Sequence, residues 1–232
     1  MRRKAVARRR PMQTHETQLR HWICEIGRRL HARGFVAAAD GNISVRLDAS
    51  RFLCTPSGMS KGHMRPVDIV VADSKGNRLA GERRVTSEFF THLAAYEERP
   101  EMQAVIHAHP TYATTLTLMD IDTTPPVLPE LIMSLVALPR APYATPGSAE
   151  GADAIRALIK RFDALLLDRH GAIVVGADLQ DAYMKMERLE SAAQTLYLAH
   201  LLGRPAALSP DKIAKLMAAT VPPDAPVPPY PF

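Results

Sequence analysis

Residues 104–109 read Ala104-Val105-Ile106-His107-Ala108-His109, and Pro110 follows them directly. This short apolar run, ended by a proline, predicts a buried strand of a sheet. Side chains two residues apart in a strand lie on the same face, so His107 and His109 project together, roughly 7 Å apart at their Cα atoms. Two such imidazoles can bind one divalent metal ion. A lone His-x-His pair is more often a surface or packing pair, so a metal site needs further ligands.

Predicted helices and strands alternate on both sides of this run. Periodicity and turn residues predict helices over 14–33, 87–98, 111–119, 148–161, 178–202 and 209–219, and strands over 43–47, 51–54, 68–72, 104–109, 164–167 and 172–175. Residues 121–146 contain six prolines, which predicts loop and edge strand. The sequence shows no internal repeat and no interdomain linker. It predicts one α/β domain over 14–220, with a central mixed or antiparallel sheet flanked by helices.

The charge is concentrated at the start of the chain. Of 29 Lys and Arg residues, six lie among the first ten residues, which contain no acidic residue. The other 23 basic residues face 24 acidic residues, so residues 11–232 sum to −1. We therefore predict a basic arm at 1–13 and no nucleic-acid partner, because the body has no basic excess with which to bind one. Residues 221–232 contain six prolines and are predicted to form an extended tail.

The remaining composition is typical of a globular protein of the cytoplasm. Hydrophobic residues make up 47% and charged residues 23% of the chain, which excludes a disordered protein. No apolar run approaches the roughly 18 residues of a membrane helix, so no membrane partner is expected. Cys24 and Cys54 are too few for a disulfide-stapled fold. We expect a cytoplasmic enzyme or binding protein.

Two further residues are candidates for the same metal site. His170 lies in a turn after the apolar Leu165–Leu167, where α/β folds place site residues. The structural alternative is a turn histidine that forms hydrogen bonds only with the local backbone. Glu88 opens the helix predicted over 87–98. The structural alternative is that Ser87 caps this helix and Glu88 is a first-turn acid favoured by the helix dipole. Beside a metal ion, Glu88 would instead be a fourth ligand or a general acid/base.

Three small loops are candidates for binding an anion. Their backbone N–H groups and hydroxyls can surround a phosphate or a carboxylate. Each loop is also an ordinary turn, and none has the spacing of a Walker or Rossmann fingerprint. The candidate residues are Gly41, Asn42, Ser57, Gly58, Thr86 and Ser87.

Taken in order, these motifs resemble the class II aldolase/adducin family over about residues 18–202. The resemblance rests on GNISVR at 41–46, TPSG at 55–58, SE at 87–88, VIHAH at 105–109, APYATPG at 141–147 and HG at 170–171. It implies a homotetramer with sites between subunits, and phosphate binding by the three small loops. It implies a bound Zn²⁺, with Mn²⁺, Fe²⁺ and Co²⁺ as alternatives, held by Glu88, His107, His109 and His170.

The resemblance also implies a carbon–carbon lyase acting on a small anionic substrate. In such enzymes the metal binds adjacent substrate oxygens and stabilises an enediolate, and Glu88 would move a proton at the enediolate carbon. Aldol cleavage of a phosphorylated hydroxy-ketone is the favoured activity. The alternative is a decarboxylase acting on an oxo-acid phosphate or a hydroxylated (hetero)aromatic carboxylic acid. Dehydratases of the family lack the metal-site Glu, its 4-epimerases tend to carry Asp there, and adducin-like interaction domains lose the metal ligands.

Two departures from the family's aldolases concern catalytic tyrosines. The aldolases carry a Tyr on the loop after His-x-His, but no Tyr occurs between Tyr112 and Tyr143 here. Glu130 is the predicted substitute, with a helix-start acid after Pro129 as the structural alternative. Tyr230 is the predicted counterpart of a tyrosine in the aldolases' C-terminal tail.

Overall fold

The sheet is the centre of the molecule. The structure is a computed structural model that describes residues 15–220. Eight strands lie in the order β4-β3-β2-β1-β5-β8-β7-β6. Every neighbouring pair is antiparallel except β6 and β7, so the sheet is mixed, as predicted. The strands are β1 (Asn42–Arg46), β2 (Arg51–Cys54), β3 (Val70–Asp73), β4 (Arg78–Ala80), β5 (Ala104–Ala108), β6 (Arg140–Ala141), β7 (Ala164–Leu167) and β8 (Gly171–Gly176).

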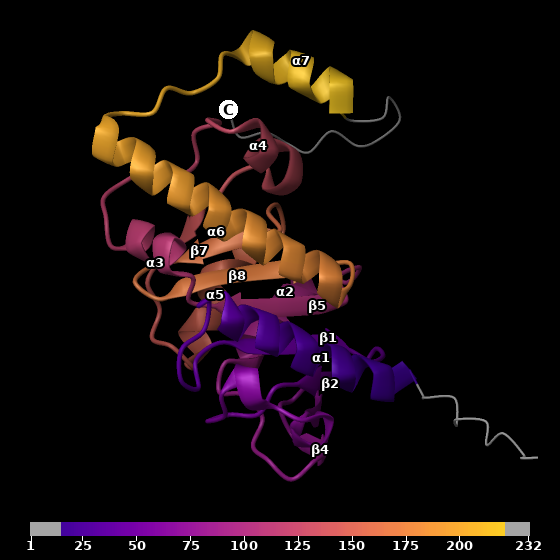
Figure 1. Cartoon of the computed structure of the whole chain (residues 1–232). Helices are drawn as coiled ribbons and strands as arrows, with labels where there is room; N and C mark the ends of the chain where they lie inside the picture. The colour runs from indigo at the N-terminus through magenta and orange to yellow at the C-terminus, as the bar shows by residue number, and fades with distance from the viewer. Residues whose placement is uncertain (1–14, 221–232) are drawn as a thin grey trace, which may run out of the picture.

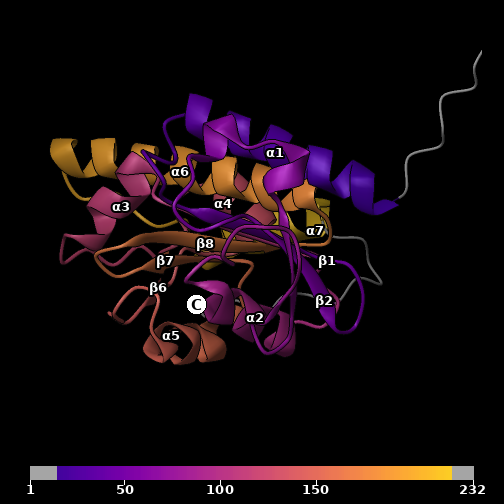
Figure 2. The ribbon, with the colours of Figure 1, turned by 90° about the horizontal axis from the view of Figure 1, so that it is seen from below.

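Helices cover both faces of this sheet. The helices are α1 (His15–Ala32), α2 (Phe89–Glu98), α3 (Thr111–Thr117), α4 (Pro129–Leu135), α5 (Ala149–Ile159), α6 (Leu179–Leu202) and α7 (Pro210–Thr220), with short 3₁₀ turns η1 (Lys61–His63) and η2 (Pro66–Asp68). Figure 2 shows α1 and α6 on one face and α2 and α5 on the other. Figure 1 shows α7 beside α4, away from the sheet. No helix within 15–220 is long and apolar enough to cross a membrane.

Strand β5 separates two hydrophobic cores, and this decides where its histidine points. Ala104, Ile106 and Ala108 pack in the core beneath α1 and α6, whereas Val105 packs in the core beneath α2 and α5. Successive strand residues face opposite sides of a sheet. His107 therefore shares the α2 and α5 side with Val105, and it is 2% exposed.

Several local predictions differ from the structure. Residues 129–135, predicted as loop, form α4, because a proline is tolerated in the first helical turn, where its missing N–H is not needed. Strand β4 has three residues, all of them exposed, so it lacks the alternation that would predict it. Strand β3 begins at Val70 instead of residue 68 because Pro66–Asp68 forms η2. The predicted arm at 1–13 and the predicted tail at 221–232 lie outside the described residues.

Candidate metal centre

Three histidines meet at one edge of the sheet. Strand β5 carries His107 and leads into His109, and β8 pairs antiparallel with β5 so that Ala172 lies opposite Ala108. This register brings the turn before β8, and with it His170, to the end of β5. One nitrogen from each of the three imidazoles lies within 4.8 Å of the others. Residues far apart in the sequence are thus brought to one point by strand pairing.

The ring nitrogens at this point present lone pairs to one another. His107 Nδ1 lies 2.9 Å from the Ala172 carbonyl oxygen and must donate to it, which leaves Nε2 without a proton in the neutral ring. Burial lowers the pKa of His107 to about 3, so the ring is neutral at pH 7. His107 Nε2 lies 3.0 Å from His109 Nε2 and 3.3 Å from a Glu88 carboxylate oxygen. Asp40, 3.7 Å from His109 Nδ1, favours a proton on that nitrogen, so His109 Nε2 is also a free acceptor.

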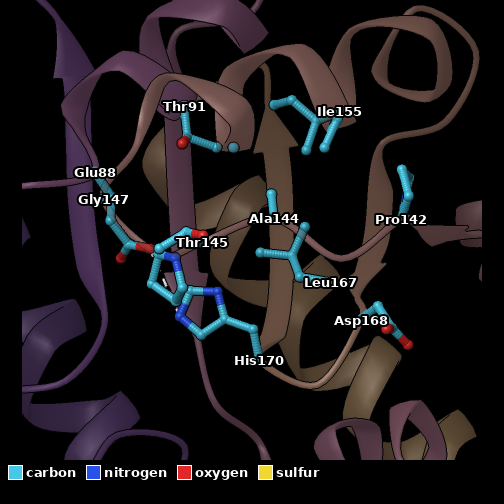
Figure 3. A pocket seen from close by; sticks show the side chains of 13 residues that line it. Glu88, Thr91, Pro142, Ala144, Thr145, Gly147, Ile155, Leu167, Asp168 and His170 are labelled. Atoms are coloured by element: carbon cyan, nitrogen blue, oxygen red, sulfur yellow. Dashed lines mark ion pairs between the residues drawn. The ribbon is translucent and has the colours of Figure 1, made fainter.

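Glu88 completes this set of acceptors. Helix α2 begins at Phe89, and Glu88 precedes it without making a side-chain cap bond, so the alternative in which Ser87 caps the helix is wrong. Figure 3 shows the Glu88 carboxylate pointing at His170, and the ion-pair distance is 3.6 Å. Burial raises the pKa of Glu88, but His107, a hydrogen bond from Asn42 and His170 outweigh it and lower the pKa overall. The carboxylate is therefore ionised at pH 7.

This donor set fits a divalent cation. Three imidazole nitrogens and one carboxylate are ligands that Zn²⁺ takes readily, and Mn²⁺, Fe²⁺ and Co²⁺ accept the same atoms. Unprotonated nitrogens and an ionised carboxylate repel one another at these distances, and a cation among them converts that repulsion into attraction. The hydrogen bond from His107 to Ala172 and the contact of His109 with Asp40 are the outer interactions that usually orient metal-binding imidazoles.

A cavity of about 190 Å³ opens beside Glu88 and His170. All six residues predicted to bind an anion line it: Gly41, Asn42, Ser57, Gly58, Thr86 and Ser87. Gly41 has φ +68°, and a Cβ there would lie 2.5 Å from the Val36 side chain and 2.9 Å from the His107 carbonyl oxygen. Only glycine lets this loop approach the end of β5 so closely.

Lys61 also lines this cavity and was not predicted. It is 1% exposed, and its Nζ donates to the carbonyl oxygens of Ala39 at 2.7 Å and Met59 at 2.6 Å. An ammonium has three N–H donors, so one remains. Burial lowers the pKa of Lys61 to about 8. Its place three residues after Gly58 was the only available signal, and nothing in the sequence shows that the side chain turns inward.

A second hollow adjoins the other side of Glu88 and His170. Figure 3 shows Thr91, Ala144, Ile155 and Leu167 around it. These side chains are mostly apolar and come from α2, α5, β7 and the segment after β6. The hollow is small, about 30 Å³, and it sets apolar side chains next to the ionised groups.

Of the two predicted auxiliary residues, Glu130 lies within the described residues. Glu130 is exposed in the first turn of α4 and lines neither cavity. Helix α4 packs against α6 and α7. Within one chain, the structure does not bring Glu130 to the histidines. Tyr230 lies outside the described residues.

Comparisons with known proteins agree with this fold. The family model for the class II aldolase and adducin N-terminal domain matches residues 21–197. The chain is 36% identical over 179 residues, 75% of its length, to 3-oxo-tetronate 4-phosphate decarboxylase of Haemophilus influenzae, of which 85% is covered. It is 34% identical over 174 residues, again 75% of its length, to L-fuculose phosphate aldolase of Methanococcus maripaludis, of which 93% is covered.

Solved structures show the same similarity. YgbL of Escherichia coli, described as a putative aldolase/epimerase/decarboxylase, superposes with a TM-score of 0.79 at 31% identity, covering 88% of this chain and 99% of that one. An L-fuculose 1-phosphate aldolase superposes with a TM-score of 0.80 at 29% identity, covering 90% and 97%. The protein with three converging histidines described here is therefore a member of the class II aldolase and adducin family.

Proposed function

We propose that this protein is a divalent-metal-dependent carbon–carbon lyase that acts on a small phosphorylated ketone. The observation that carries the proposal is that the cluster of metal-type ligands and the anion cavity have two residues in common. Glu88 and His170 belong both to the cluster of metal-type ligands and to the cavity lined by glycines, hydroxyls and Lys61. A phosphate held in that cavity would place the carbon chain of its substrate beside the cluster.

His107, His109 and His170 would hold the ion, with Glu88 as a fourth ligand that substrate can displace. When bound, such an ion acts as a Lewis acid that stabilises negative charge on a substrate oxygen. Zn²⁺ is the ion proposed, with Mn²⁺, Fe²⁺ and Co²⁺ as alternatives. Asp40 and the Ala172 carbonyl would keep the imidazoles in their ligand orientation.

The remaining roles follow from position. Backbone N–H groups and hydroxyls of the six small residues, with the free N–H of Lys61, would bind the phosphate. The apolar side chains of the second hollow would exclude water from the carbon undergoing reaction. Glu88, ionised and next to both cavities, would move a proton at that carbon.

Of the two bond cleavages, we favour decarboxylation of a 2-hydroxy-3-oxo-acid phosphate. Aldol cleavage must also remove a proton from the hydroxyl of the departing fragment, and Glu130, the predicted substitute for the aldolases' loop tyrosine, lines neither cavity. Carbon dioxide leaves without such a transfer, and both cleavages yield the same enediolate. The relative that is 36% identical is a decarboxylase, which supports this choice.

A product assay tests the reaction directly. The metal-loaded protein is incubated with 3-oxo-tetronate 4-phosphate and, separately, with L-fuculose 1-phosphate. We expect carbon dioxide from the first, at a higher kcat/KM than aldehyde from the second. Aldehyde release as the faster reaction would assign aldol cleavage, and turnover of neither substrate in the presence of any of the four metals would count against the lyase proposal.

Lys61→Met is expected to weaken substrate binding more than turnover. A hydrogen bond from a charged donor contributes roughly 1.5–3 kcal/mol, so KM should rise about 10- to 100-fold, while kcat changes by less than about threefold. Lys61→Arg keeps the charge, so its KM should lie between those of Lys61→Met and the wild type. Lys160→Met, which removes a half-exposed lysine paired with Glu98, is the matched control.

The same residue gives KM a pH dependence. Because the pKa of Lys61 is lowered to about 8, its charge is present below that pH and is lost as the pH rises through it. The wild-type KM should therefore rise between about pH 7 and 9, and Lys61→Met should abolish that rise. An unchanged slope in the variant would assign the titration to another group.

Assembly and location form part of the same proposal. The family resemblance implies a homotetramer with sites between subunits, and we expect a cytoplasmic enzyme. Since Glu130 is exposed and distant from its own chain's cavities, a catalytic role for it requires that it reach the site of a neighbouring subunit. Sedimentation velocity reports the number of subunits. If it shows that the active protein is a monomer, Glu130 has no catalytic role.

A further inference from the structure

A chain of buried polar side chains leads from Glu88 away from the cavity. Asn42 Nδ2 lies 2.7 Å from Glu88 Oε2, and Asn42 Oδ1 lies 2.5 Å from His92 Nε2. On the far side of that ring, Ser44 Oγ lies 2.7 Å from His92 Nδ1 and 2.9 Å from Tyr96 Oη. None of the four residues beyond Glu88 is more than 4% exposed.

The spacing of the residues explains why this chain forms. Glu88 directly precedes α2, and His92 and Tyr96 follow at four-residue steps within the helix, so the three lie along one side of α2, with His92 and Tyr96 about 6 Å apart along its axis. Asn42 and Ser44 are two residues apart on one face of β1, so their Cα atoms are also roughly 6 to 7 Å apart. The two periods match, so each strand side chain fits between two helix side chains.

Only one arrangement of protons satisfies every atom in this chain. Asn42 Nδ2 donates to Glu88 Oε2, which turns the amide oxygen of Asn42 toward His92 Nε2. His92 Nε2 must then carry the proton, which makes Nδ1 an acceptor for the Ser44 hydroxyl. Ser44 in turn accepts from Tyr96. A flipped amide would set its carbonyl oxygen against the carboxylate.

The two titratable members stay in the forms that this order needs. Burial lowers the pKa of His92 to about 4, so the ring is neutral with a single proton. Burial also raises the pKa of Tyr96, so its hydroxyl keeps its proton and can donate. The groups facing His92 are the Ser44 hydroxyl and the Asn42 amide, both neutral, with Glu88 one residue further along the chain.

We propose that His92 is a positioning residue for Glu88. Held in its Nε2–H tautomer by Ser44 and Tyr96, it orients the Asn42 amide, which binds one carboxylate oxygen and sets the direction in which Glu88 faces the histidines. Asn42 thus has a second role besides lining the anion cavity. The inference rests on the proposed function only in that Glu88 moves a proton in turnover.

The test compares four variants on the metal-loaded protein. His92→Phe removes the donor to Asn42, and His92→Gln supplies an amide N–H in its place. Ser44→Ala removes the donor that holds His92 in its Nε2–H tautomer. Tyr96→Phe removes the donor to Ser44 but leaves the Ser44 hydroxyl able to donate to His92 Nδ1. We expect kcat to fall about 10- to 100-fold in His92→Phe with KM and metal content unchanged, the size typical of residues supporting a reacting group. His92→Gln should recover about tenfold, and Ser44→Ala should lose more than Tyr96→Phe.

Two readouts separate positioning from a purely structural role. In a double-mutant cycle, His92→Phe should have almost no further effect on kcat in a Glu88→Gln background, because both changes act on one group. Equal losses in His92→Phe and His92→Gln, or independent losses in the cycle, would overturn the proposal. Melting temperatures of all variants show whether any loss reflects unfolding.

The tautomer can be measured without substrate. Nitrogen NMR of ¹⁵N-histidine-labelled protein should show the proton of His92 on Nε2 in the wild type, and a shift toward Nδ1 in Ser44→Ala. A proton on Nδ1 in the wild type would refute the order of hydrogen bonds described above. This readout needs no turnover. An inactive wild type would therefore reject the lyase proposal, while the measured tautomer of His92 would still test the hydrogen-bond order proposed for His92.

Discussion

Glu88→Gln is expected to lower kcat by roughly 10²- to 10⁴-fold, the range for removing a general acid or base. Glutamine has nearly the same shape, and its Oε1 can still accept the hydrogen bond from Asn42. It cannot take up or release the proton at the reacting carbon. KM should change little, because the glycines, hydroxyls and Lys61 that would hold the phosphate remain in place.

The control is a matching change at the other end of the same helix. Glu97→Gln removes one carboxylate from α2, where its partner is Arg156 at the surface. Its kcat should stay within about twofold of the wild type, since exposed pairs contribute little. Metal content, measured on both variants, shows whether Glu88 is also needed as a ligand. Full activity in Glu88→Gln would remove Glu88 from the mechanism, and loss of metal together with activity would make it chiefly a ligand.

The metal-type cluster was largely predictable because its members are set by local rules. His107 and His109 lie on one strand face by the two-residue period, and Pro110 ends that strand. His170 lies in the turn after an apolar strand. That these residues meet depends on β5 pairing with β8, which the sequence of either strand alone does not encode. The family resemblance supplied that long-range information.

The missed residues depend on packing between distant elements. Lys61 looks like a surface lysine in a polar loop, and only the enclosure of its Nζ by Ala39 and Met59 makes it part of the cavity. His92 looks like one more residue of a helix, and its role appears only when the four-residue period of α2 is set against the two-residue period of β1. Such matches between elements cannot be derived from the hydrophobic pattern of one segment.

The cavities and the buried chain meet at Glu88 from different directions. His107 and Asn42 both contact Glu88 Oε2, and His170 lies nearest to Oε1. A carboxylate held this way has few free rotations, so little reorganisation is needed when a substrate arrives. The family resemblance identifies the residues that would react. The residues that orient Glu88 are identified only by the packing of α2 against β1.

His109→Ala is expected to abolish metal binding and, with it, turnover. His109 is the most exposed of the three histidines, with 26% of its side chain accessible, so its truncation disturbs the core least. Two imidazoles and a carboxylate would remain, one ligand short of the set that closes around the ion. We expect the metal content to fall from about one ion per chain to a small fraction of that, with no activity above that of chelator-treated wild type.

Thermal unfolding gives this prediction a readout that needs no substrate. A ligand present at 100 times its Kd stabilises the folded state by about 2.7 kcal/mol, which corresponds to roughly 5–11 °C in Tm for a chain of this size. Added Zn²⁺ should therefore raise the Tm of chelator-treated wild type and of a His63→Ala control, whose histidine is exposed and bonded only to Ser60 among the described residues. The same addition should leave the Tm of His109→Ala unchanged. An equal rise in His109→Ala would mean that the ion binds elsewhere, and the close approach of His107 Nε2 to His109 Nε2 would then need another explanation.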